Sequence, residues 1–229
     1  MSARSHIGTR TRFILLLGAM AIALSACGGG EGGPRKRDAD GRVLPTPAEM
    51  DPTSTLYAQA VNRAAQGTCD EETFNVLTCF AYRGHGYEGA QTALGQCHLA
   101  AGDKVEGATW VGRAANAGWA DAQKLLARLY LRGDGLAENP VEGAKWAKLY
   151  SRNPSLLSLG VQPDPSVAED FKSVLTREDN ATADARALRW TPSYWEPDTQ
   201  LDQDIRRSCV REARRPLQEH KIPSMPNPH

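Results

Sequence analysis

Hydrophobic residues between positions 55 and 152 recur with the period of an α-helix. The clearest example is a stripe at positions i, i+3, i+4, i+7 and i+8, made of Ala122, Leu125, Leu126, Leu129 and Tyr130, which lies along one helical face. Two further helices are predicted over 55–66 and 71–83, separated by a Gly-Thr-Cys turn at 67–69. This part of the chain is therefore predicted to be all-α.

The helical pattern is also repeated in the sequence itself. Residues 105–110 (VEGATW) recur at 141–146 (VEGAKW), an offset of 36, and residues 86–91 (GYEGAQ) recur at 118–123 (GWADAQ), an offset of 32. The two offsets differ because the second copy has the longer turn between its paired helices, at 132–140. A period in the thirties with helical patterning is typical of helix pairs stacked into an array.

Beyond the repeats, the sequence predicts a helical extension over 153–220. Helices are expected over 166–176, where Ser166 is a candidate cap, over 181–190 and over 199–219. The loop before the last helix carries Tyr194 and Trp195. We expect these aromatic residues to pack on the last repeat; the alternative is a platform for a ligand. Residues 221–229 include three prolines and are predicted to be a loose tail.

The predicted last helix is amphipathic. A stripe at a spacing of four holds Leu201, Ile205, Cys209, Ala213 and Leu217, and arginines occupy the other faces, at Arg206, Arg207, Arg211, Arg214 and Arg215. We expect the helix to cap the open end of the array, as terminal units of solenoids do. A compatible interpretation is a basic docking surface for an acidic partner, with Arg207, Arg211 and Arg214 as candidate contacts. The predicted fold is thus an α/α solenoid with a C-terminal capping helix.

The N-terminus has the layout of a secretory signal. Residues 1–12 carry three arginines and no acid, residues 13–24 are apolar or small, and residues 24–27 read Leu-Ser-Ala-Cys. The last segment resembles a bacterial lipobox, which implies a signal peptide over 1–26 and lipid on the sulfur and amine of Cys27. Two or more acyl chains anchor a protein stably. Glycine follows Cys27, which by resemblance to Gram-negative sorting signals implies the outer membrane. The alternative is an ordinary signal peptide containing a cysteine.

Composition sets the mature chain apart from several classes of protein. Of 229 residues, 41% are apolar and 24% charged, an apolar share too high for a wholly disordered chain. Removing residues 1–26 takes away three arginines and no acid, leaving 24 basic and 27 acidic residues. This balance opposes nucleic-acid binding. Residues 27–52, rich in Gly, Pro and charge, are predicted to be a flexible tether after the lipidated cysteine.

Residues 53–152 resemble the Sel-one-like repeats, which are relatives of the tetratricopeptide repeat. The family's first-helix pattern, Ala-x-x-Leu-Gly-x-x-Tyr, is matched in part at 90–95 (AQTALG) and 122–130 (AQKLLARLY). Its Gly-x-Gly turn is matched at 133–135. Its second-helix pattern, Ala-x-x-Trp, is matched in part at 108–110 (ATW) and 144–146 (AKW). The first copy lacks the Gly-x-Gly turn. The resemblance implies an all-α array that binds protein segments.

Four further cysteines are candidates for disulfides: Cys69, Cys79, Cys97 and Cys209. The periplasm is oxidising, and four cysteines allow three pairings. A straight helix over 71–83 would carry Cys79 away from Cys69, while Cys209 is placed to tie the last helix to the array. The alternative is buried free thiols. We disfavour a zinc site from Cys79, His85, Cys97 and His98, because no Cys-x-x-Cys or His-x-x-x-His pair is present.

The sequence carries no recognised catalytic motif. It has no Gly-x-Ser-x-Gly elbow, phosphate-binding loop, dinucleotide fingerprint or His-Glu-x-x-His. The carboxylate pairs at 71–72 and 178–179 are interpreted as helix starts. We expect neither enzyme activity nor a cofactor or metal.

The predicted function is protein binding by a membrane-anchored lipoprotein that faces the periplasm. Helix-pair arrays present a concave surface to protein segments, and the candidate contacts there are Gln91, Gln123 and Lys124. Sel-one-like lipoproteins resemble immunity proteins that protect Gram-negative cells from lipase effectors of type VI secretion, which implies a secreted lipase as partner. The alternatives are a scaffold or regulator of an envelope enzyme or assembly and, less favoured, a hydrolase.

Overall fold

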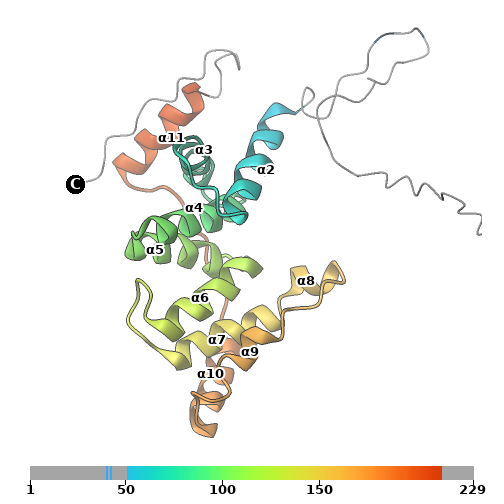
Figure 1. Cartoon of the computed structure of the whole chain (residues 1–229), viewed down its shortest axis with the longest axis vertical. Helices are drawn as coiled ribbons and strands as arrows, with labels where there is room; N and C mark the ends of the chain where they lie inside the picture. The colour runs from blue at the N-terminus through green and yellow to red at the C-terminus, as the bar shows by residue number, and fades with distance from the viewer. Residues whose placement is uncertain (1–39, 41, 43–50, 213–229) are drawn as a thin grey trace, which may run out of the picture. The chain divides into compact units, whose positions relative to one another are not determined.

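The computed structural model describes residues 40, 42 and 51–212, without the side chains of residues 208 and 210–212. Within these ranges the chain is helical and has no strand (Figure 1). The predicted signal peptide, Cys27, nearly all of the tether, Arg214 and the tail lie outside the described residues, so those calls stay predictions.

Consecutive helix pairs form the array, and each helix packs against the next one in the chain. The two copies of the sequence repeat fold as two of these pairs, which confirms the prediction of a helical repeat array. In chain order the helices are α2 (Pro52–Ala65) with α3 (Glu71–Ala81), α4 (Glu88–Ala101) with α5 (Lys104–Asn116), and α6 (Ala120–Arg132) with α7 (Pro140–Ser151).

Short polar side chains and glycines set the ends of these helices. Asp70 accepts a hydrogen bond from the Thr73 amide at 3.0 Å and so begins α3, and Asn139 caps α7 in the same way. Gly102 and Gly133 end α4 and α6 in the left-handed conformation, at φ of 94° and 68°.

A close contact between backbones joins α4 to α5 through glycines. A Cβ atom built on Gly95 would lie 2.8 Å from the carbonyl oxygen of Gly107, and one built on Gly107 would lie 2.9 Å from that of Gly95. The two backbones therefore touch directly. Around them, Leu77, Leu94 and Trp110 belong to one buried cluster, and a second cluster lies between α5 and α10.

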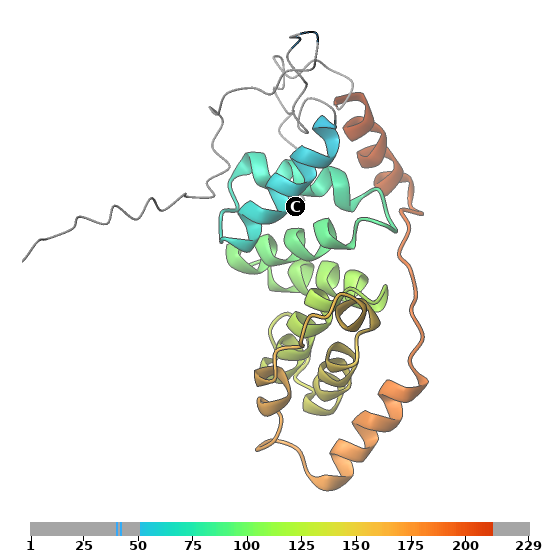
Figure 2. The same cartoon turned by 90° about the vertical axis from the view of Figure 1, so that its right-hand side faces the viewer.

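After α7 the chain runs past the end of the array and then returns. The short helices α8 (Pro154–Ser158) and α9 (Ser166–Glu169) precede α10 (Arg177–Arg189), which packs on α7, and α11 (Gln200–Glu212) lies against α3. Residues 190–199, called the strap here, have no regular structure and connect α10 to α11, as the extended orange segment in Figure 2 shows.

The last helix, predicted to cap an open end of the array, packs on α3 of the first pair, and another helix packs on the last pair. The helix packed on the last pair is α10, which starts at Arg177 rather than 181 because Thr176 and Asp179 form a capping box. The predicted helix over 166–176 ends at Glu169. The last helix is instead carried back by the strap to the first pair.

The glycine contact predicts opposite effects of the same substitution within α5. Gly107→Ala places a Cβ 2.7 Å from Leu99 Cγ and 2.9 Å from a backbone oxygen, so we expect a loss of about 2–3 kcal/mol in the free energy of unfolding. At Gly112 a Cβ meets nothing within 4 Å, so Gly112→Ala should stabilise by about 0.5–1 kcal/mol. Chemical denaturation measures both; equal effects would contradict the contact.

Candidate functional site

All four described cysteines are joined in disulfides. Cys69 pairs with Cys97 across 28 residues, and Cys79 pairs with Cys209 across 130 residues, with Cα–Cα distances of 5.4 and 5.2 Å. The second bond ties α11 to α3, as expected for Cys209. Since Cys79 and Cys97 are both oxidised, they are not available as zinc ligands. Among the residues that the structure describes, no group of three or more His, Cys, Asp or Glu could hold a metal ion.

The prediction that Gln91 and Gln123 line a binding face is wrong, because both side chains are buried. The amide of Gln91 donates to the Gly84 carbonyl at 3.1 Å, in the turn after α3. Gln123 accepts from the Asn153 amide at 2.9 Å. Buried carbonyl and amide groups need hydrogen-bond partners. Gln91 supplies a partner to the Gly84 carbonyl, and Gln123 supplies one to the side-chain amide of Asn153. Lys124 is one-third exposed and lies 4.0 Å from Asp121.

The basic docking surface proposed for α11 is described only in part. Arg207 is exposed and forms an ion pair with Asp204 on the same helix. The side chain of Arg211 and the whole of Arg214 lie outside the described residues, so that surface remains a prediction.

The strap aromatics pack on the first two helix pairs, not on the last repeat as predicted. The ring centroid of Trp195 lies 5.3 Å from that of Trp110 and 5.8 Å from that of Tyr82. The Arg113 guanidinium stacks on Trp195 at 4.1 Å and on Trp110 at 4.2 Å. Burial raises the pKa of Tyr82 and lowers the pKa of Arg113, because desolvation disfavours each charged form.

Hydrogen bonds extend this contact along the strap. The Ser193 amide donates to the Asn116 carbonyl at 2.8 Å, and the Glu196 carboxylate accepts from the His85 amide at 3.2 Å. Tyr194 packs on the His85 ring with centroids 3.9 Å apart. The strap thereby covers a face of α5 and the turn after α3.

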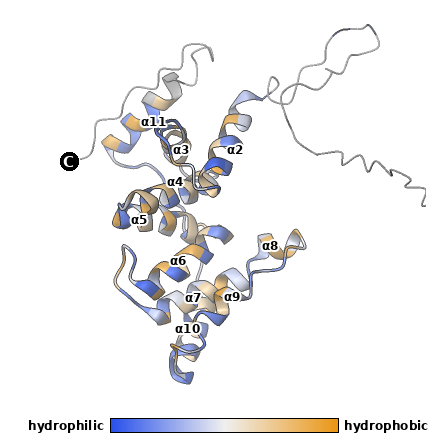
Figure 3. Ribbon diagram, in the orientation of Figure 1, coloured by the Kyte–Doolittle hydropathy of each residue, from blue (hydrophilic) through white to orange (hydrophobic). Residues whose placement is uncertain are grey.

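An exposed, uncharged segment between α7 and α9 was not anticipated from the sequence. Residues 153–163, called the finger here, hold no charge, and Leu157, Leu159 and Val161 are 55%, 76% and 47% exposed. Figure 3 shows hydrophobic residues on α8, which stands out from the array. The available signal was an eleven-residue run without charge at 153–163. Such exposed aliphatic clusters mark interaction surfaces.

The base of the finger is fixed by Asn153. Its side-chain NH2 group donates to the Gly118 carbonyl and to Gln123 Oε1, each at 2.9 Å. Its side-chain oxygen Oδ1 accepts from the Ser155 amide and so caps α8. Gly118 precedes Trp119, which is 41% exposed. The finger therefore starts close to Trp119, which is a further exposed apolar residue.

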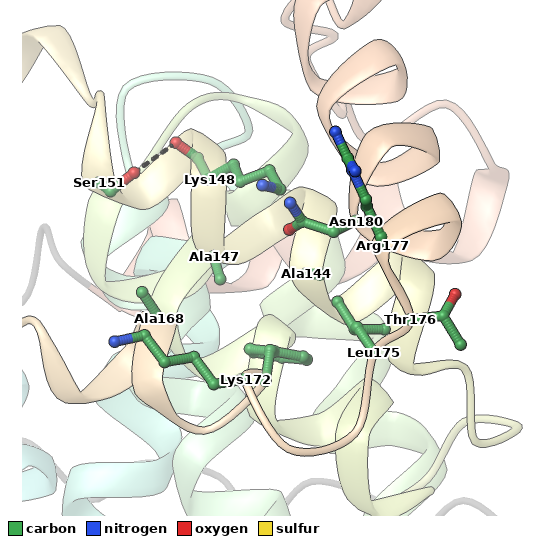
Figure 4. A pocket seen from close by; sticks show the side chains of 11 residues that line it. Ala144, Ala147, Lys148, Ser151, Ala168, Lys172, Leu175, Thr176, Arg177 and Asn180 are labelled. Atoms are coloured by element: carbon green, nitrogen blue, oxygen red, sulfur yellow. Dashed lines mark hydrogen bonds between the residues drawn. The ribbon is translucent and has the colours of Figure 1, made fainter.

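A cavity of about 430 Å³ lies between α7, α9 and the start of α10. Ala144, Ala147 and Leu175 form an apolar wall, whereas the polar ends of Lys148, Arg177 and Asn180 gather on another side (Figure 4). Ser151 and Ala168 also line it, and they lie just before and just after the finger. Finger and cavity together, called the docking surface here, offer apolar contacts beside the cations of Arg177 and of Lys148, whose ammonium pairs with Asp184 at 3.0 Å. This combination suits an apolar and acidic partner.

Comparison of the chain with protein-family models, with curated proteins and with solved structures finds no match. Within the described ranges, no helix is both long and apolar enough to cross a membrane.

The two disulfides predict unequal losses of stability. In the chain-entropy model, closing loops of 28 and 130 residues stabilises by about 4 and about 5 kcal/mol. Cys79→Ala with Cys209→Ala should therefore lower the free energy of unfolding by about 1 kcal/mol more than Cys69→Ala with Cys97→Ala. Denaturant titration of both double variants gives the comparison. A larger loss from the shorter loop would contradict this entropic account.

Proposed function

We propose that this chain is a non-catalytic, lipid-anchored protein that faces the periplasm and binds a protein partner. The best candidate role is that of an immunity protein that neutralises a secreted antibacterial enzyme, such as a lipase effector of type VI secretion. The observation that carries the proposal is the docking surface, in which an exposed uncharged finger stands beside a cavity with a cationic side.

The chemistry of the finger favours a partner with an apolar cleft. Leu157, Leu159 and Val161 lose unfavourable water contact when they enter such a cleft, and burying one such side chain contributes roughly 1.5–3 kcal/mol. A lipase needs an apolar cleft to hold acyl chains. Filling that cleft would exclude the substrate, so neutralisation requires no chemistry from the immunity protein.

The predicted anchor would strengthen such an inhibitor. Lipid on Cys27 and a tether over 27–52 would hold the array beside the membrane that a lipase attacks. Confinement of this kind raises the effective concentration of the binder without any new contact. The resemblance to Sel-one-like lipoproteins points to the same role.

The second candidate is a scaffold or regulator of an envelope enzyme or assembly. Stacked helix pairs support this role equally, since solenoids commonly present extended binding surfaces. The two candidates differ in the partner: a secreted toxin in one case and a resident envelope protein in the other. A hydrolase is the least favoured candidate.

The partner is identified by using the chain from Asp51 onward, which contains every described helix, as bait against the secretome and envelope extract of the source organism. The immunity role predicts recovery of one secreted lipase at equal stoichiometry, with its activity blocked in the complex. Recovery of resident envelope proteins alone would reject immunity and leave the scaffold.

A matched pair of leucines tests the docking surface. Leu159 on the finger and Leu188 on α10 are both 76% exposed. Leu159→Asp should weaken binding of the recovered partner at least 30-fold, which corresponds to about 2 kcal/mol for a residue central to an interface. Leu188→Asp should change the Kd less than threefold. Calorimetric titration provides both values, and equal losses would remove the finger from the interface.

A further inference from the structure

The surface formed by α5 and the turn after α3 already holds an extended segment in the manner of a peptide-binding site. The strap has no helix of its own there, and it is bound through aromatic, cation–π and main-chain contacts. The Trp195 site, as we call it, consists of the side chains of Tyr82, Trp110 and Arg113 and the backbone amide of His85.

We propose that the Trp195 site recognises an extended segment of a partner protein in which Trp is followed by Glu, and that the strap is a competing ligand in the same chain. The site is distinct from the docking surface, and its assignment is independent of the proposed function.

The contacts of the Trp195 site are selective for this chemistry. An indole ring fits between two aromatic side chains that meet it edge to face, at interplanar angles of 79° and 80°. Its face stacks on the Arg113 guanidinium at 4.1 Å. Trp is the aromatic side chain that binds a cation most strongly. Substituting a smaller residue would leave Arg113 without that contact.

The residue after the tryptophan is selected separately. Glu196 accepts the His85 amide, and it packs so closely over Gly84 that a Cβ built there would lie 2.2 Å from Glu196 Oε2. Gly84 has a φ of 85° and is buried. The Glu196 carboxylate therefore occupies space that a side chain at position 84 would fill. Pro197, the next residue of the strap, is buried.

Chain connectivity keeps the strap in place. α10 holds one end on α7, and the Cys79–Cys209 disulfide holds the other end on α3. Most described side chains of α11 are exposed, Leu201 at 69%, so α11 itself contributes little burial. Two fixed ends give the strap a high effective concentration at the site, which a partner segment has to overcome.

The test uses the full chain and a labelled synthetic peptide of residues 190–199 (WTPSYWEPDT). In the Trp195→Ala/Glu196→Ala chain the strap loses the contacts of Trp195 and Glu196. The hydrogen bond of Ser193, the packing of Tyr194 and the disulfide remain. We expect this variant to bind the peptide at least tenfold more tightly than the unchanged chain, as measured by fluorescence polarisation. A peptide with alanine at both positions should not bind.

Two further substitutions locate the binding. Added to the double variant, Arg113→Ala should abolish peptide binding, whereas Arg128→Ala should not, because Arg128 contacts Asp170 on another surface. If circular dichroism shows that the double variant is unfolded, the peptide is titrated into the Glu196→Gln chain, where at least a threefold gain is expected.

Two outcomes would overturn the proposal. The first is a folded variant that binds the peptide no better than the unchanged chain does. The second is refolding of the unchanged chain into dimers linked by Cys79 and Cys209 of different copies, which would assign the site to a second copy of this chain instead of a partner protein.

Discussion

Packing of Trp195 against Tyr82, Trp110 and Arg113 determines the course of the chain after α10. Because this contact lies on α5 and the turn after α3, the strap has to run back along the array. That return places Cys209 within bonding distance of Cys79 and covers one face of the helix pairs. The exposed apolar residues of the finger lie on different elements, after α7. A contact between four side chains thus decides which surface is available to other molecules.

Much of the fold is predictable from the sequence, because the helical period and the repeat are local signals. The stripe through Leu126 and Leu129 and the paired copies at 105–110 and 141–146 both correspond to observed helices. The return of the strap is not predictable in this way, since it depends on contacts between Trp195 and residues about 85 to 115 positions earlier. Hydrophobic patterning carries no information about such a partner.

Polar residues were the least predictable part of the candidate site. Gln91 and Gln123 look like surface residues from their chemistry, yet both are buried because turn carbonyls and Asn153 need hydrogen-bond partners. The finger was overlooked for the opposite reason: aliphatic residues such as Leu157 and Leu159 are usually assigned to a core. Only the packing of the neighbouring helices leaves them exposed.

The Cys79–Cys209 bond has a consequence for how the array loses structure. In a linear solenoid each unit contacts only its neighbours, so unfolding begins by fraying at a free end and spreads inward. Here the segment after the last pair is covalently attached to the first pair. Separating α10 from α7 therefore gains less chain entropy than it would at an open end, and loosening the last pair pulls on the strap and on α3. The array is expected to unfold as one cooperative unit, whereas an open stack of the same helices would melt in stages.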